Sequence, residues 1–173
     1  SSTPRYRIFT LTELNKRPIR NRLYSYVADL EMALAEAIEK EYPKSGPLAE
    51  VVNYTTKESW ESSKDMPPES HISQFMNLSD MKKLVQDSQS LSAQCGLKKD
   101  GMSIDEIEMD DDFGELDSGD ALLKIKDCRN KIIHANRILV GDRDDYNQLL
   151  TSLQLIYVVL GSLSDSYTLE KES

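Results

Sequence analysis

Long hydrophobic runs are missing from the sequence, and their absence limits the kinds of protein it can encode. No stretch approaches the ~18 consecutive apolar residues that a membrane-spanning helix requires. No secretory signal heads the chain, so we expect a soluble, cytoplasmic protein with no membrane partner. The chain opens with Ser1-Ser2-Thr3-Pro4 rather than an initiator methionine, which favours a piece of a longer protein.

Glycine, proline and aromatic residues are also scarce. The sequence has 7 glycines, 6 prolines and an aromatic content of 7%. Strands are enriched in aromatic and β-branched residues, and strand-rich folds need many turns, so this composition favours helices. A chain of 173 residues is long enough for one domain, because a domain of this size buries roughly 70% of its unfolded surface.

The sequence has only two cysteines, Cys95 and Cys128. Neither belongs to a C-x-x-C motif or a Cys/His cluster, which argues against a zinc site and a disulfide framework. We expect two reduced thiols near the core. A Walker glycine loop, a G-x-S-x-G elbow and an H-E-x-x-H pair are all missing as well. The sequence therefore predicts no metal and no cofactor.

The net charge of −9 is concentrated in one segment. Residues 100–120 hold ten acids and no Lys or Arg, and removing these ten negative charges from −9 leaves +1. The spacing does not match an EF-hand, because Gly114 would place Met109 at the first calcium-ligand position. We therefore expect a solvated acidic loop over residues 97–117 rather than a metal site.

Apolar residues that recur at three- and four-residue steps predict five helices. They cover residues 18–42, 47–60, 79–95 with Gly96 as C-terminal cap, 118–136, and 143–166. The sequence thus predicts an all-α, up-down helical bundle of about five helices in one domain, 18–166, with the long acidic loop inserted. A basic N-terminal arm, 1–17, is expected to be extended, and 167–173 is expected to be a C-terminal tail.

Arg129 is unusual because the helical period places it inside the apolar stripe of the fourth helix. With Leu122 at zero, Arg129 lies at ~340°, whereas Asn130 and His134 lie at ~80° and ~120° on the adjoining face. A buried charge without a partner costs several kcal/mol, so we expect an ion pair. Glu31, beside the apolar stripe of the first helix, is the natural partner. An alternative interpretation is that Arg129 is only a structural anchor and His134 an ordinary surface histidine.

The run Arg129-Asn130-Lys131-Ile132-Ile133-His134 resembles a motif of the HEPN superfamily (higher eukaryotes and prokaryotes nucleotide-binding domains). That motif has an arginine, a polar residue, three further residues and a histidine. It also lies late in an all-α domain, ahead of a final amphipathic helix. The segment Leu23 to Glu31 is similar to the opening helix of bacterial members. The resemblance spans most of residues 18–166, but the acidic segment belongs to no pattern of the family.

The resemblance implies a homodimer whose two motifs face each other across a cleft. In many members of the family, this dimer is a metal-independent endoribonuclease. His134 would be the acid or base for attack by a ribose 2′-OH. Arg129 would clamp the phosphate, and Asn130 would orient or contact it. Arg129 and His134 point ~140° apart on one helix, so this mechanism requires a composite site across a twofold axis.

RNA binding normally needs a basic surface, and this chain is acidic. The candidate RNA contacts are Arg17, Arg20, Arg22, Lys124, Lys131 and Arg137, each of which could equally be a solvated surface charge. The acidic segment is opposite in charge to the N-terminal arm, which suggests that it covers the arm or the cleft and suppresses activity.

Two other functions compete with the endoribonuclease. One is a noncatalytic HEPN-like module that dimerises and binds a nucleotide or a partner protein. The other is a generic helical adaptor in which the motif is coincidental. The family resemblance implies a toxin–antitoxin or anti-phage context, with an antitoxin or another protein as partner.

Overall fold

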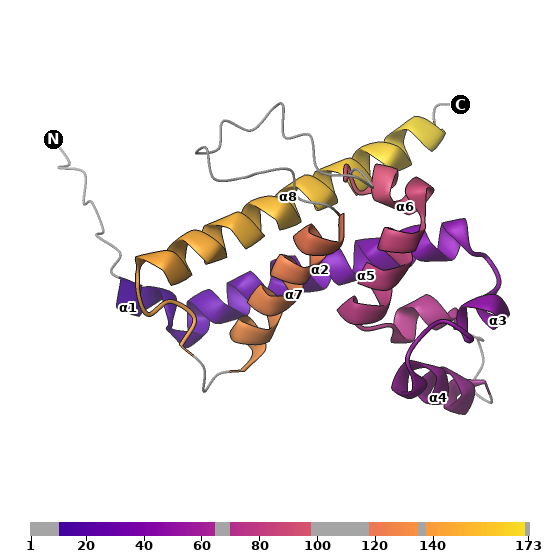
Figure 1. The fold of residues 1–173 in the computed structure, drawn as a ribbon, viewed down its shortest axis with the longest axis horizontal. Helices are drawn as coiled ribbons and strands as arrows, with labels where there is room; N and C mark the ends of the chain where they lie inside the picture. Colours follow the sequence, from indigo (N-terminus) through magenta and orange to yellow (C-terminus); the bar gives the residue numbers. More distant parts are fainter. Residues whose placement is uncertain (1–10, 65–69, 98–117, 135–137, 172–173) are drawn as a thin grey trace, which may run out of the picture.

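A computed structural model describes residues 11–64, 70–97, 118–134 and 138–171 of the chain. The regular structure in these ranges is helical, without a strand, so the predicted all-α class is confirmed (Figure 1). The elements are α1 (Leu11–Leu14), α2 (Arg17–Glu41), α3 (Ser45–Leu48), α4 (Tyr54–Ser63), the 3-10 helix η1 (Ile72–Phe75), α5 (Leu78–Asp87), α6 (Gln89–Gln94), α7 (Ser118–Ile133) and α8 (Arg143–Lys171).

Two of the predicted helices are each broken by a capping side chain. The prediction of one helix over 47–60 is wrong, because this segment holds the end of α3 and the start of α4. The Asn53 side chain accepts a hydrogen bond from the Thr56 amide and so caps the start of α4. The predicted helix over 79–95 starts instead after Asn77, and it divides at Ser88, whose Oγ accepts from the Leu91 amide. Local capping therefore overrides the apolar period at both places.

Helical structure extends into both predicted end segments. Within the arm predicted for 1–17, Leu11–Leu14 form α1 and Arg17 begins α2. Within the tail predicted for 167–173, α8 continues to Lys171. Residues 1–10 and all but the first residue of the predicted acidic loop lie outside the described ranges.

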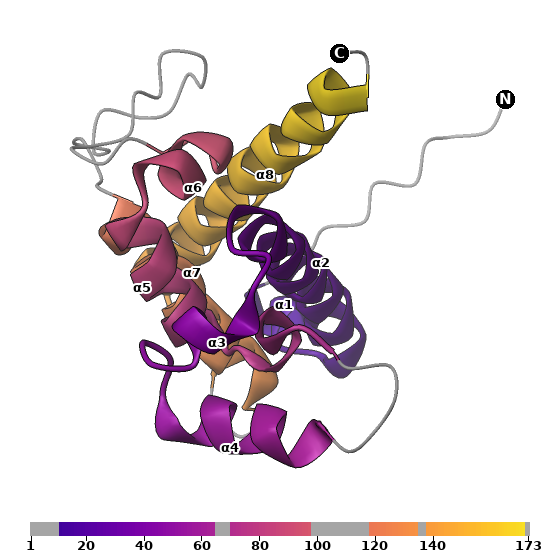
Figure 2. The same ribbon diagram turned by 90° about the vertical axis from the view of Figure 1, so that its right-hand side faces the viewer.

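The helices α2, α7 and α8 contact one another and form the centre of the molecule. In Figure 1, α7 runs in the direction opposite to α8, and Figure 2 shows α2 and α8 crossing at an angle. Helix α5 packs on α7, and α6 contacts both α2 and α8. Both views place α3 and α4 at the end of the molecule remote from α8.

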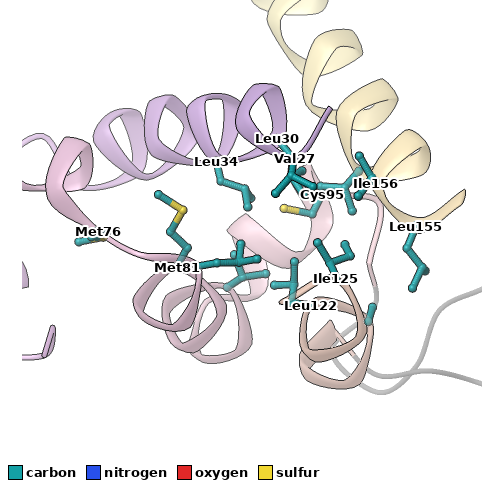
Figure 3. Packing of buried hydrophobic residues seen from close by; sticks show 14 of the residues in the cluster. Val27, Leu30, Leu34, Met76, Met81, Cys95, Leu122, Ile125, Leu155 and Ile156 are labelled. Carbon is teal, nitrogen blue, oxygen red and sulfur yellow. The ribbon is translucent and has the colours of Figure 1, made fainter. Parts of the chain in front are cut away.

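The core lies where these helices meet. Val27 and Leu34 of α2 pack in one cluster with Leu122 of α7 and Ile156 of α8 (Figure 3). The buried face of α8 includes Leu155 and Val159, whereas Tyr157 is 79% exposed and Leu150 is exposed too. The buried faces of α2 and α7 fix how these two helices meet, and the predicted site lies at that junction.

Gly96 ends α6 as the sequence predicted. Its φ of +69° is the left-handed conformation that glycine adopts without strain. The Leu97 amide donates to the Ser92 carbonyl at 2.8 Å and the Gly96 amide to the Ala93 carbonyl at 2.9 Å, which satisfies the carbonyls at the helix end. A Cβ at this position would also clash with Ser162 of α8. Glycine is thus required for both the turn and the packing.

Candidate functional site

Arg129 is held by Glu31 at the junction of α7 and α2. Its Nε donates to Glu31 Oε1 at 3.2 Å, and the two side chains are 32% and 23% exposed. The ion pair expected from the helical phase is therefore present. Because the pair is only half-buried, the guanidinium is fixed in position while part of its surface remains in contact with solvent.

Asn130 contacts the same guanidinium from its own helix. Its Oδ1 accepts from Arg129 Nη1 at 3.5 Å, a long hydrogen bond. The two contacts use Nε and Nη1, and Nη2 of Arg129 has no hydrogen-bond partner among the described residues. A guanidinium fixed in this way can present its remaining donors to an anion in a defined geometry.

His134 lies just past the last residue of α7, and it is exposed. Its amide donates to the Asn130 carbonyl at 3.2 Å, which continues the helical turn by one residue. Its helical phase is ~140° from that of Arg129. Within the described ranges, no hydrogen bond joins the His134 ring to Arg129 or Asn130. One chain therefore does not bring the arginine and the histidine into a compact site.

The second histidine, His71, is structural. One ring nitrogen, Nε2, lies 2.9 Å from the Tyr42 carbonyl oxygen, and Nδ1 lies 2.9 Å from Ser73 Oγ. The ring also accepts from the Ser73 amide at the start of η1. Since the chain has two histidines, His134 is the one exposed imidazole that can take part in acid–base chemistry at a surface site.

Arg20 was predicted to contact RNA at the surface, but its side chain is buried in the structure. The side chain is 7% exposed. Its Nη1 donates to the Lys131 carbonyl at 2.7 Å, with longer contacts to the carbonyls of Ile132 and His134. Arg20 therefore binds the C-terminal end of α7, the helix that carries the candidate motif.

The other predicted RNA contacts are not gathered around Arg129. Lys131 is engaged in a salt bridge, with Nζ 2.9 Å from Asp145 Oδ1. That hydrogen bond, together with one from the Gly141 amide, holds the pKa of the Asp145 carboxyl below its ordinary value. Arg22 is exposed, but it lies ~180° around α2 from Glu31. Arg137 lies outside the described residues.

Asn15 binds the backbone between α7 and α8, a role that the sequence did not predict. Its Oδ1 accepts from the amides of Leu139 and Val140 at 2.7 and 3.1 Å, and its Nδ2 donates to the Val140 carbonyl at 2.7 Å. Its own carbonyl accepts from Arg20 Nε at 3.2 Å. One asparagine thus ties the start of α2 to the segment between α7 and α8. No sequence motif marks such a contact.

A hollow of about 420 Å³ adjoins Glu31 along α2. It is lined by Glu36 and Glu39 as well as Glu31, with Met32 and Met81 among its apolar residues. Three carboxylates repel a phosphate, so an RNA backbone is not expected to enter this hollow. Any phosphate would have to approach Arg129 from the α7 side.

The two cysteines are free and buried. Burial raises the pKa of the Cys95 thiol to about 12 and that of Cys128 to about 11, although Ser152 and Lys131 partly oppose the shift at Cys128. Neither thiol is suited to nucleophilic chemistry near neutral pH, since the thiolate is the reactive form.

The described ranges contain no group of three or more His, Cys, Asp or Glu side chains that could hold a metal ion. No helix there has the length and apolar character needed to cross a membrane.

Comparison of the chain with protein-family models, with curated proteins and with solved structures gives no match.

Proposed function

We propose that this protein is a metal-independent endoribonuclease of HEPN type that acts as a homodimer. The observation that carries the proposal is the half-buried Arg129, fixed by Glu31 and contacted by Asn130, on a helix that ends at the exposed His134. A purely structural ion pair requires neither the adjacent amide nor an exposed imidazole at the end of the same helix. The resemblance of this run to the HEPN motif supports the same chemistry.

The reaction is attack by a ribose 2′-OH on the neighbouring phosphate. The bond from O2′ to phosphorus forms while the bond from phosphorus to O5′ breaks, which leaves a 2′,3′-cyclic phosphate and a 5′-hydroxyl. His134 takes the proton from O2′ or delivers one to O5′. Arg129 stabilises the charge that develops on the phosphate oxygens, and Asn130 keeps the guanidinium oriented.

Dimerisation supplies what one chain lacks. Ile133 of α7 is 38% exposed and lies ~40° around its helix from Arg129, and Tyr24 of α2 is 46% exposed and lies ~20° from Glu31. A second copy packed on this flank would cover both apolar side chains. In a twofold arrangement, Arg129 of one protomer then lies beside the partner's His134.

The test is cleavage of a labelled RNA in EDTA by the wild type, His134→Ala and Arg129→Ala. We expect the wild type to produce fragments that end in a 2′,3′-cyclic phosphate, and both variants to lose at least about 100-fold in rate. Gln148→Ala, which alters an exposed neutral residue of the neighbouring helix α8, is the control and should cleave normally. Cleavage that needs a divalent cation, or that survives in His134→Ala, contradicts the proposal.

A noncatalytic HEPN-like module that binds a nucleotide or a partner protein is the alternative function. The observation that favours it is the shortage of free basic side chains, since Arg20 and Lys131 make structural contacts. No cleavage by the wild type, together with saturable binding of a nucleotide that Arg129→Ala abolishes, would support this module. A toxin–antitoxin or anti-phage role, with an antitoxin as partner, is the context proposed for the nuclease.

A further inference from the structure

We infer that Arg20 and Asn15 form a clasp that fixes the position of His134, and that both are positioning residues for the reaction. The inference rests on the proposed function for its catalytic consequence. Its structural part is independent, because it concerns how the end of α7 is held.

One half of the clasp is Arg20 on the end of α7. The last carbonyl groups of an α-helix have no partner within the helix, and the helix dipole makes this end negative. The Arg20 guanidinium is buried there and donates from Nη1 to the carbonyls of Lys131, Ile132 and His134 at 2.7, 3.3 and 3.4 Å. A cation with several donors therefore satisfies the turn that carries the histidine.

The other half is Asn15 on the segment that leads into α8. Its side chain makes three hydrogen bonds with the backbone of Leu139 and Val140, both of which are buried. The Asn15 carbonyl in turn accepts from Arg20 Nε at 3.2 Å. Arg20 and Asn15 are thus hydrogen-bonded to each other. Together they bind the backbone on both sides of residues 135–137, at His134 and at Leu139 and Val140.

The clasp and the Glu31 ion pair originate from the same flank of α2. Positions 20 and 31 come within ~20° of each other around the helix. Through Arg20, α2 holds the end of α7 at His134, and through Glu31 it holds Arg129. One rigid helix therefore sets where both proposed catalytic side chains stand, and this geometry would fix their separation in a dimer.

The inference predicts different consequences for removing the clasp and for removing the ion pair. Without Arg20, the carbonyls at the end of α7 lose their donors, and the final turn frays. Arg129 keeps its contact with Glu31, so RNA binding is retained while the imidazole is misplaced. Misplacement of a catalytic group by about 1 Å costs on the order of 100-fold in rate, so the loss should fall on kcat rather than on KM.

The experiment compares Arg20→Met and Asn15→Ala with Lys40→Met, which alters an exposed cation of the same helix. Amide hydrogen exchange is measured at residues 130–134 and 138–140, and RNA cleavage is measured in parallel. We expect exchange at both segments to accelerate about tenfold or more in the two clasp variants while Val27 to Leu34 of α2 stays protected. We also expect kcat to fall about 10- to 100-fold with little change in KM. Lys40→Met should match the wild type in both measurements.

Each result decides one part of the inference. Unchanged exchange at residues 130–134 in both clasp variants overturns the clasp, whether or not the protein cleaves RNA. Faster exchange with unchanged kcat overturns the positioning role. If the wild type cleaves no RNA, the proposed function fails. The exchange rates and NMR relaxation of the His134 ring then test the structural part of the inference, which is that the clasp holds the end of α7. Asn15→Ala removes only one half of the clasp, which keeps the test available if Arg20→Met does not fold.

Discussion

Arg20 and Glu31 lie on the same flank of α2, and each binds α7 through a different kind of group. Glu31 accepts from the Arg129 side chain, whereas Arg20 donates to backbone carbonyls at the helix end, with Nη1 at 2.7 Å from the Lys131 oxygen. The first contact fixes a side chain and the second fixes the backbone. The candidate motif is therefore held by α2 rather than by α7 alone.

The Glu31 contact should stabilise the fold by a modest amount. Glu31→Gln removes the charge that pairs with Arg129, and because the pair is half-buried we expect a loss of about 1 kcal/mol in the free energy of unfolding. This corresponds to a decrease in Tm of about 2–4 °C for a protein of this size. Urea denaturation measures the change. Glu36→Gln, an exposed residue of the same helix, should change stability by less than about 0.5 kcal/mol, and equal losses in the two variants would contradict the account.

The buried cysteines predict slow alkylation and a loss of stability at alkaline pH. Their folded-state pKa values of about 12 and about 11 lie above the ordinary 9.0. A thiol with a raised pKa contributes stability that is fully present below pH 9 and is lost as the pH rises through the folded values. At pH 8, iodoacetamide should modify the native protein far more slowly than the protein in urea. Cys95→Ala and Cys128→Ala report which thiol is responsible, and rapid modification of both thiols in the native state would be the contrary result.

Asp145 predicts a loss of stability in acid. The Lys131 ammonium and the Gly141 amide hold the pKa of this carboxyl below its ordinary 3.8. The contribution is therefore fully present above pH 3.8 and is lost as the pH falls through the lower folded value. Urea denaturation between about pH 6 and pH 3 should show a weaker pH dependence in Asp145→Asn than in the wild type. Asp144→Asn, an exposed neighbour, should retain the wild-type dependence.

The sequence was sufficient to predict those contacts that depend on helical phase. Arg129 stands out because it is a charge inside an apolar stripe, and Glu31 is on the matching flank of another predicted helix. The same reasoning applies to Arg20, which lies one helical step before Leu23 in the stripe of α2, but its role was not predicted. Its partners are backbone carbonyls of a distant helix end, and backbone groups leave no mark in a sequence. Asn15 escaped prediction for the same reason.

The wrong boundaries have a local cause. Asn53 and Ser88 each begin a new helix by capping, in segments where the apolar period continues without a break. Periodicity alone cannot separate one long helix from two short ones that share a buried side. In α8 the period was right, but apolar residues such as Tyr157 occur on the exposed side too, so the direction of the buried face depended on tertiary packing.

In the proposed reaction, Arg129 of one protomer acts with His134 of the other. The decisive experiment mixes Arg129→Ala protein with His134→Ala protein, each inactive alone, under conditions that let subunits exchange. Random exchange makes half of the dimers mixed, and a mixed dimer contains one intact composite site out of two. We therefore expect the mixture to recover about one quarter of wild-type RNA cleavage in EDTA. A mixture as inactive as its two components, with subunit exchange verified by differential labelling, would contradict the composite site.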